Sequence, residues 1–308
     1  MGVAVCLSSI PAAAQHNPLK AVSPATRQLL QKGQYSEALV EIDQRLLTDS
    51  LNTNLLGLRA ECHMALLSDA HATLALADLN KALRLRPNTW LYLFERSYAY
   101  FMLRRYPESV ADLSTAIKQT PAQPALICQR GYSQLSANHL PEALTDFAQA
   151  SSLAPDEQEY TLMLAIGQML TGRYPEALQT CNRLVSQHKA YGLGLANRAL
   201  IRQHLRDPAG ARQDANEALR LSANDSTSRL ISAFIYQQAG ETATAQRLYD
   251  EVRPQYKYPA NLYCERGDLY LQLGNVAAAE ADWKQAAGLG SLVAASRLAA
   301  GFQPQPQR

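Results

Sequence analysis

The sequence predicts an all-α fold, a superhelix (solenoid) of helix pairs stacked along the chain. Small residues recur every 34 residues in three rows, and Gly and Pro stand at matching points of each period. A fixed period of this length is typical of repeat architectures, in which each unit buries its apolar face only against its neighbours. The 308 residues therefore indicate one stack of units instead of two globular domains of about 150 residues.

The three rows, in which small residues alternate only at two places with Leu184 and Val252, keep one register over most of the chain. The row Ser97, Gly131, Ala165, Ala199, Ala233 and Gly267 is accompanied by Ser109, Ala143, Ala177, Ala211, Ala245 and Ala279, and by Ala116, Ala150, Leu184, Ala218, Val252 and Ala286.

Within a repeat, the apolar residues follow a helical period. In 141–150, Pro141 opens a segment whose apolar residues Ala143, Leu144, Phe147 and Ala150 recur at i, i+3 and i+4. Small residues in the rows let paired helices approach closely, so a Leu in place of Ala143 would overpack the contact at about 1–3 kcal/mol. Each repeat is therefore expected to be two helices joined by a short turn.

This pattern resembles the tetratricopeptide repeat, which has small residues at repeat positions 8, 20 and 27. Other positions agree with it: Gly33, Gly172, Gly240 and Gly274 at position 15, Tyr35, Tyr106 and Tyr174 at position 17, and Pro87, Pro121 and Pro155 at position 32. The resemblance covers about nine-tenths of the chain and implies a right-handed α-α superhelix of about eight helix-turn-helix units.

The register divides the solenoid, residues 19–290, into eight repeats near 19–52, 53–89, 90–123, 124–157, 158–191, 192–225, 226–259 and 260–290. The second repeat has three extra residues between Ala60 and Ala75. We expect residues 15–23 to be a linker, residues 291–301 to form a capping helix over the last repeat, and residues 302–308 to be a disordered tail.

A charge pair keeps step with the register. Five repeats carry both an Arg at position 7 and an Asp at position 23, and two repeats that lack the Arg, having Leu164 or Ser232, also lack the Asp. A stripe of arginines that binds phosphate or RNA has no reason to keep an acidic partner, so we favour structural ion pairs between the two helices of a repeat. The predicted pairs are Arg59–Asp78, Arg96–Asp112, Arg130–Asp146, Arg198–Asp214 and Arg266–Asp282.

The resemblance also implies a partner-binding groove lined by the first helix of each repeat. The candidate groove residues are Leu91, Phe94, Tyr98, Phe101, Met102, Cys128, Tyr132, Leu162 and Ile166. Phe94, Tyr98 and Phe101 are either exposed contact residues or side chains that the curvature buries against the next repeat, and the sequence leaves both open. The set of Lys, Asn and Arg that chaperone-binding members use to hold a carboxylate is not found; Asn197 stands alone.

The residue pattern gives no argument for catalysis, for a bound cofactor or for a metal site. No two of the six His residues are four apart, and no HExxH, GxSxG, Walker-type or GxGxxG motif occurs. Cys62 beside His63 is the single close Cys/His pair and is interpreted as a buried residue next to an exposed one. Because the repeat cysteines stand in separate units, we expect free, mostly buried thiols.

The N-terminus carries a weak targeting signal. Residues 3–10 are apolar, and Ala12 and Ala14 fit a small-x-small cleavage rule, so residues 1–14 are a candidate signal peptide with a mature start at Gln15. The positive segment that precedes the apolar run of such peptides is missing. A periplasmic or secreted protein is expected, and a cytoplasmic one is the alternative.

The sequence therefore predicts a non-enzymatic scaffold that binds a peptide or helical segment of an unidentified partner protein. The net charge of 29 − 27 = +2 argues against nucleic acid as the partner. The sequence has no run of about 18 apolar residues, so no transmembrane helix is predicted. Helical-repeat RNA binding and a self-associating accessory module remain the alternatives, and the oligomeric state is left open.

Overall fold

The computed structural model describes residues 18–66, 68–222, 225–252, 259–272 and 275–299, and the regular secondary structure in these ranges is helical. The candidate signal peptide 1–14 and the tail 302–308 lie outside the described residues. Both therefore stay predictions. The chain forms two compact units, Met1–Met163 and Leu164–Arg308, and the boundary falls inside helix α10 (Gln158–Leu170).

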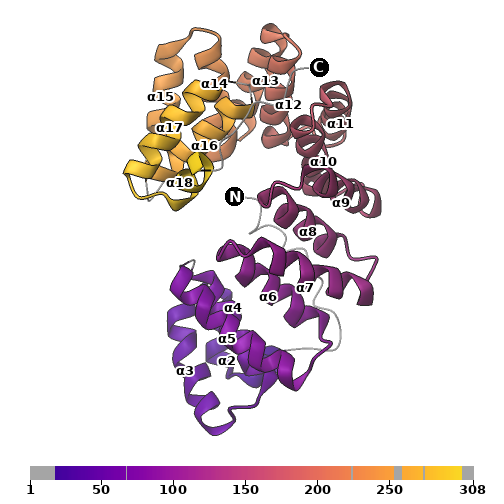
Figure 1. Cartoon of the computed structure of the whole chain (residues 1–308), viewed down its shortest axis with the longest axis vertical. Helices are drawn as coiled ribbons and strands as arrows, with labels where there is room; N and C mark the ends of the chain where they lie inside the picture. The colour runs from indigo at the N-terminus through magenta and orange to yellow at the C-terminus, as the bar shows by residue number, and fades with distance from the viewer. Residues whose placement is uncertain (1–17, 67, 223–224, 253–258, 273–274, 300–308) are drawn as a thin grey trace. The chain divides into compact units, whose positions relative to one another are not determined.

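The first unit is a succession of antiparallel helix pairs that follow one another along the chain (Figure 1). Its helices before α10 are η1 (Pro18–Ala21), α2 (Pro24–Gln31), α3 (Tyr35–Thr48), α4 (Thr53–Ala65), α5 (Asp69–Leu85), α6 (Trp90–Met102), α7 (Tyr106–Gln119), α8 (Pro124–Ser136) and α9 (Leu140–Leu153). Each pair, for example α4 with α5 or α6 with α7, lies within one of the repeat ranges set by the sequence register.

The second unit continues with the same pattern. Its helices after α10 are α11 (Tyr174–Gln187), α12 (Gly192–His204), α13 (Pro208–Leu221), α14 (Ser226–Gln238), α15 (Thr242–Val252), α16 (Pro259–Gln272), α17 (Val276–Gly288) and α18 (Leu292–Ala299). Helix α18 packs on α17 and buries Ala294 in the core of this unit. The segment expected to be a capping helix is thus helical over residues 292–299. The all-α solenoid class is confirmed.

Local sequence signals explain where the helices begin and end. Proline occupies the first or second position of α7, α8, α9, α11 and α13, where a missing backbone N–H costs nothing. Asn52 and Asp225 cap α4 and α14 by accepting hydrogen bonds from backbone N–H groups of the first turn. These caps are local contacts that mark the first turns of α4 and α14, each the first helix of its repeat.

The turn inside several repeats needs a left-handed residue. Gly33, Gly172 and Gly240 have φ of 72°, 76° and 78°, while Arg104, Asn138 and Arg206 adopt φ of 58°, 63° and 59° at the equivalent place. Asn tolerates this conformation, but Arg is strained there because its Cβ approaches the backbone carbonyl. The predicted turn glycine Gly274 lies outside the described residues.

The small residues of the rows are the points of closest helix contact. Ala143, Ala177 and Ala211 are 0–1% exposed. A Cβ placed on Gly131 would lie 2.6 Å from the Phe147 ring, and one placed on Gly267 would lie 2.6 Å from the Trp283 ring nitrogen. The large side chain in the second helix thus occupies the space that the small residue of the first helix leaves, and the two helices cannot accept an added methyl group at these points.

The first helices form the more closely spaced layer of each unit. Besides the chain-adjacent pairs, α4 contacts α6 in the first unit, and α12 contacts α14 and α14 contacts α16 in the second. When one layer of a two-layer stack is spaced more closely than the other, the stack curves toward that layer. The first helices therefore lie on the inner side of the local curvature, as the repeat resemblance implied.

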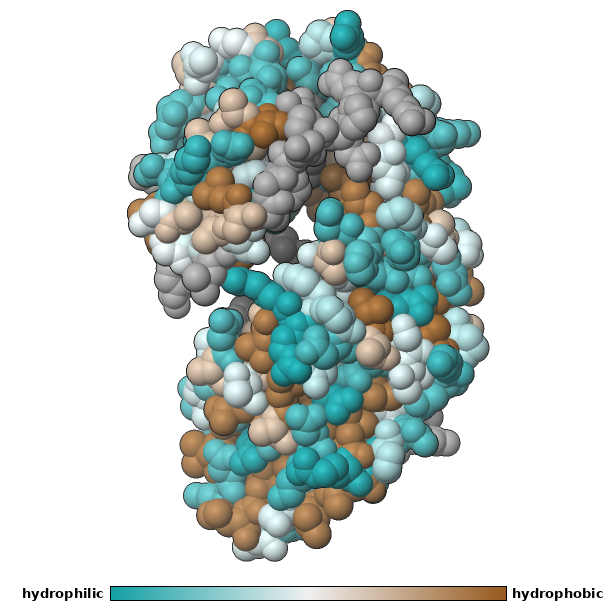
Figure 2. Space-filling view, viewed as in Figure 1, coloured by the Kyte–Doolittle hydropathy of each residue, from teal (hydrophilic) through white to brown (hydrophobic). Residues whose placement is uncertain are grey.

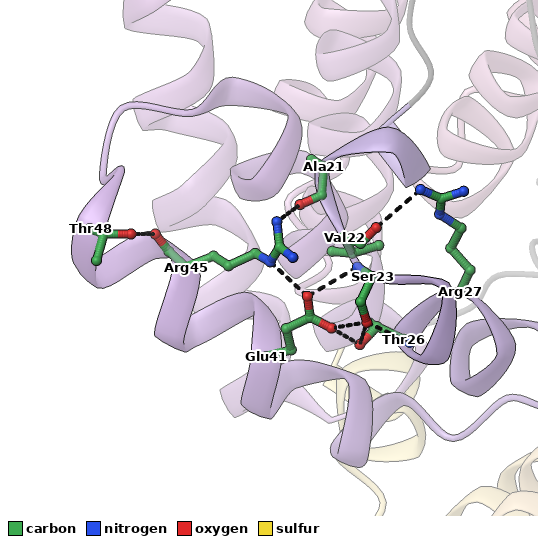
Figure 3. A network of polar contacts seen from close by, with 8 residues as sticks. All are labelled: Ala21, Val22, Ser23, Thr26, Arg27, Glu41, Arg45 and Thr48. Carbon is green, nitrogen blue, oxygen red and sulfur yellow. Dashed lines mark hydrogen bonds and ion pairs between the residues drawn. The ribbon is translucent and has the colours of Figure 1, made fainter.

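The N-terminal end of the first unit is closed by a polar network around Glu41 (Figure 3). The Glu41 carboxylate accepts hydrogen bonds from the Ser23 N–H at 3.0 Å, the Ser23 hydroxyl at 2.6 Å, the Thr26 hydroxyl and Arg45 Nε at 2.6 Å. Residues 18–23, the end of the expected linker, hold η1 and the buried Val22. Burial raises the pKa of Glu41, but these hydrogen bonds outweigh it and lower the pKa from 4.5 to about 2.

Apolar side chains also reach the surface of the first unit, over its N-terminal helices (Figure 2). Val40, Leu47 and Leu51, in or just after α3, are 60%, 86% and 60% exposed. Exposed apolar residues of this kind are ordinary on protein surfaces and carry no function by themselves.

Replacement of Gly172 by Ala is expected to lower the free energy of unfolding by about 1 kcal/mol, because φ is positive there. No atom lies within 4 Å of the added Cβ, so the effect comes from the backbone alone. Gly288→Ala is the matched control, since its Cβ also meets no atom and its φ is not positive. Chemical denaturation should show no loss for the control, and equal losses in both variants would contradict the backbone account.

Replacement of Glu41 by Gln should remove a pH dependence of stability. The folded-state pKa lies below the unfolded value, so the stabilisation is complete above about pH 4.5 and is lost as the pH falls toward 2. At pH 7 we expect the free energy of unfolding of the variant to be about 1–2 kcal/mol lower than that of the wild type. Denaturation curves of both proteins between pH 2 and 7 should converge at the acidic end; a constant difference would contradict the role of the charge.

Candidate partner-binding surface

Five bidentate ion pairs join the two helices within repeats, as the register predicts. In α8 and α9, Arg130 donates from Nε to Oδ2 of Asp146 at 2.8 Å and from Nη2 to Oδ1 at 2.7 Å. The same two bonds, at 2.6–2.8 Å, are made in the four other pairs, Arg59–Asp78, Arg96–Asp112, Arg198–Asp214 and Arg266–Asp282. This prediction is confirmed for all five pairs.

The arginines also reach a third helix, which the sequence reasoning missed. Nη1 of Arg59 contacts Asp43 of α3 at 2.8 Å, and Nη1 of Arg96 contacts Asn80 of α5 at 2.8 Å. Arg130 reaches Ser114 at 3.4 Å and Arg198 reaches Asn182 at 3.0 Å, each in the second helix of the preceding repeat. The sequence signal was present, because a polar residue stands 16 positions before each of these arginines.

Burial makes these pairs structural. The Asp side chains are 4–10% exposed and the Arg side chains 16–27%. Hydrogen bonds to the Asp partners raise the pKa of Arg96, Arg130 and Arg198, although burial opposes the shift. With their donors committed to two helices, these arginines do not form a free basic stripe for phosphate or RNA.

The fifth repeat replaces the ion pair by a neutral contact. Leu164 stands in place of the Arg, and the Thr180 hydroxyl donates to the Gln168 side-chain oxygen at 2.8 Å. Thr180 is 7% exposed, so its hydroxyl is satisfied without a charge. Where Leu164 replaces the Arg, the residue at the Asp position is thus a neutral one that finds its partner at Gln168, one turn further along α10.

Removal of one carboxylate should destabilise the first unit strongly. Asp146→Ala leaves Arg130 without its bidentate partner beside a buried site, and we expect a loss of about 3 kcal/mol in the free energy of unfolding. Glu142→Ala, on the exposed side of the same helix, is the control and should change stability by less than about 0.5 kcal/mol. A loss for Asp146→Ala no larger than that of the control would show that the pair contributes little.

The candidate groove residues divide into two groups. The buried ones are Phe94 (1% exposed), Tyr98 (6%), Cys128 (0%), Tyr132 (9%) and Leu162 (4%). Phe94 and Tyr98 belong to the apolar core of the first unit, and Tyr132 packs edge-on against Phe147 at a ring distance of 5.6 Å. Of the two alternatives that the sequence left open, burial in the core therefore holds for Phe94 and Tyr98. Leu91, Phe101, Met102 and Ile166 are partly exposed and keep surface for a partner.

The thiols agree with the expectation of free, buried cysteines. Cys62, Cys128 and Cys181 are free and buried, Cys264 is buried, and burial raises the pKa of the Cys62 and Cys181 thiols to about 12. His63, next to Cys62, instead pairs with His71 of α5, with 2.9 Å between the two Nδ1 atoms. Thiols with such a pKa are poor nucleophiles at neutral pH.

Among the described residues, no group of three or more His, Cys, Asp or Glu side chains is placed to hold a metal ion. Within the same residues, each helix is too short or too polar to cross a bilayer.

Comparisons with known proteins identify the family. Models described as tetratricopeptide repeat match residues 64–124 and 128–194, and a further one matches residues 260–289. No curated protein matches the chain.

Solved structures agree on the fold. A chain of the APC/C Cut9–Hcn1 hetero-tetramer is 14% identical with a TM-score of 0.55, over 91% of this chain and 55% of its own length. A tetratricopeptide repeat protein from Parabacteroides merdae is 18% identical with a TM-score of 0.53, over 89% of this chain and 95% of that one.

Pseudomonas aeruginosa pilF is 17% identical with a TM-score of 0.56, over 70% of this chain and 94% of that one. The present chain spans little more than half of the Cut9–Hcn1 chain that it matches. At these identities the likeness concerns the fold alone. The family models, the helix pairs and the 34-residue register together show that the chain belongs to the tetratricopeptide repeat family.

Proposed function

We propose that the chain is a non-enzymatic scaffold that binds a peptide or helical segment of a partner protein along the first helices of its repeats. The tetratricopeptide fold is a scaffold for protein–protein interaction. The observation that carries the proposal is the set of partly exposed apolar side chains, Leu91, Phe101 and Met102, on the inner helix α6. Such side chains supply apolar contact area to a partner that lies along the inner face.

The charge distribution supports a protein partner over a nucleic acid. Arg59, Arg96 and Arg130 form bidentate pairs with Asp, so they are not free to neutralise phosphates. Nucleic-acid binding by helical repeats relies on unpaired cations along the binding face. The paired row thus favours the scaffold over the RNA-binding alternative.

The test replaces apolar residues on the two sides of the helix pairs. Leu91→Ala/Phe101→Ala removes contact area from the inner helix α6, and Leu47→Ala/Leu74→Ala removes similar area from the exposed sides of α3 and α5. Circular dichroism melting of all variants first checks that each one folds. Phe94→Ala is avoided because a cavity in the core would cost several kcal/mol.

A photo-cross-linking residue at position 101 then captures partners in cells, and mass spectrometry identifies the cross-linked segment. We expect a discrete partner segment whose recovery by the affinity-tagged chain falls at least about tenfold in the Leu91/Phe101 variant and stays unchanged in the Leu47/Leu74 variant. Equal recovery with both variants would reject the inner face as the binding surface.

A further inference from the structure

Two glutamates stand on neighbouring first helices of the first unit. Glu61 lies in α4, one turn after Gly57, and Glu95 lies in α6, which contacts α4. A Cβ placed on Gly57 would lie 3.6 Å from Oε2 of Glu95 and 3.0 Å from the ring of Tyr92. Because Gly57 has no side chain, the Glu95 carboxyl can lie against α4 at this point.

The acceptors at this place are unusually short of donors. Oε2 of Glu95 is closed off from solvent and has no hydrogen-bond partner. Oδ1 of Asn54, one turn before Gly57 on α4, is also buried without a partner. A buried acceptor without a donor costs about 1–3 kcal/mol, and native structures keep few of them, so each one requires an explanation.

The pKa directions agree with two crowded, uncompensated carboxyls. Burial, and secondarily the charge of Glu61, raises the pKa of Glu95 well above its usual value. Burial also raises the pKa of Glu61, although the side chain of Glu61 is exposed.

The nearest arginines on the same helices do not compensate these carboxyls. Arg59 of α4 binds Asp78 and Asp43, and Arg96 of α6 binds Asp112 and Asn80. Their guanidinium groups are therefore held toward the second helices. Within the described residues, neither Glu61 nor Glu95 has an ion-pair partner among these arginines.

We propose that the side chains of Glu61 and Glu95 and the side-chain amide oxygen of Asn54 form an acceptor site for one cationic side chain, lysine or arginine, of the bound partner segment. The site rests on the proposed function and adds the chemistry that the partner must present. An ammonium or guanidinium group supplies several N–H donors in one place, and charge-assisted bonds to carboxylates are about twice as strong as neutral ones. The partner is thus a segment with a basic residue next to apolar residues that contact Leu91 and Phe101.

The experiment titrates the full chain with N-acetyl-lysine methylamide or N-acetyl-arginine methylamide and follows the backbone amide resonance of Gly57. Wild-type protein should show a saturable shift with at least one of the two probes, and the comparison tells lysine from arginine. Nε-acetylation of the lysine probe removes its charge and should abolish the shift. Glu95→Gln and Glu61→Gln should each weaken binding at least about fivefold, and the exposed Glu142→Gln should leave it unchanged.

The variants are expected to fold, because Glu95→Gln removes an uncompensated buried acid and keeps the side-chain shape. Equal shifts in wild type and Glu95→Gln, equal shifts with the acetylated probe, or the absence of a saturable shift with both probes would overturn the site. This readout is separate from partner capture. If partner recovery is equal in the Leu91/Phe101 and Leu47/Leu74 variants while the lysine or arginine probe still shifts the Gly57 resonance, the scaffold surface is rejected and the cation site is retained.

Discussion

The close approach of two helices at small residues is the constraint on which the other features of each unit depend. Gly131 and Gly267 leave the space that Phe147 and Trp283 fill, and alanines hold the corresponding places in other repeats. A pair packed in this way still has one apolar face uncovered, which only a neighbouring pair can bury. The 34-residue period is therefore a direct consequence of one packing contact repeated along the chain.

The arginine row adds direction to this stacking. Each arginine binds the Asp of its own pair through two donors, and four of the five bind the second helix of the preceding repeat through a third. The five pairs alone use ten of the 56 charged residues inside the stack, so much of the near-neutral charge of the chain is internal. Such pairs contribute little net energy compared with apolar packing, but an alternative register would leave a buried charge without its partner.

The inner helices carry both core residues and surface residues, and the repeat pattern in the sequence does not distinguish the two. Phe94 and Tyr98 lie on the same helix as Leu91 and Phe101, yet the first two are core residues and the last two reach the surface. The difference is made by the neighbouring helices α4 and α5, which cover part of α6. The Glu95 carboxyl lies against Gly57 for the same reason, since the two residues belong to different repeats and come together only when α4 and α6 are neighbours.

The sequence by itself determined the all-α class, the places of the helix pairs and the five Arg–Asp pairs. These features repeat with the register, so one period carries enough information to predict them. The tertiary structure alone decided the burial of Phe94 and Tyr98 and the place of the Glu95 carboxyl against Gly57 of α4. Those features depend on the spacing between neighbouring repeats, which is set by the summed packing of many side chains and not by the period within any one repeat.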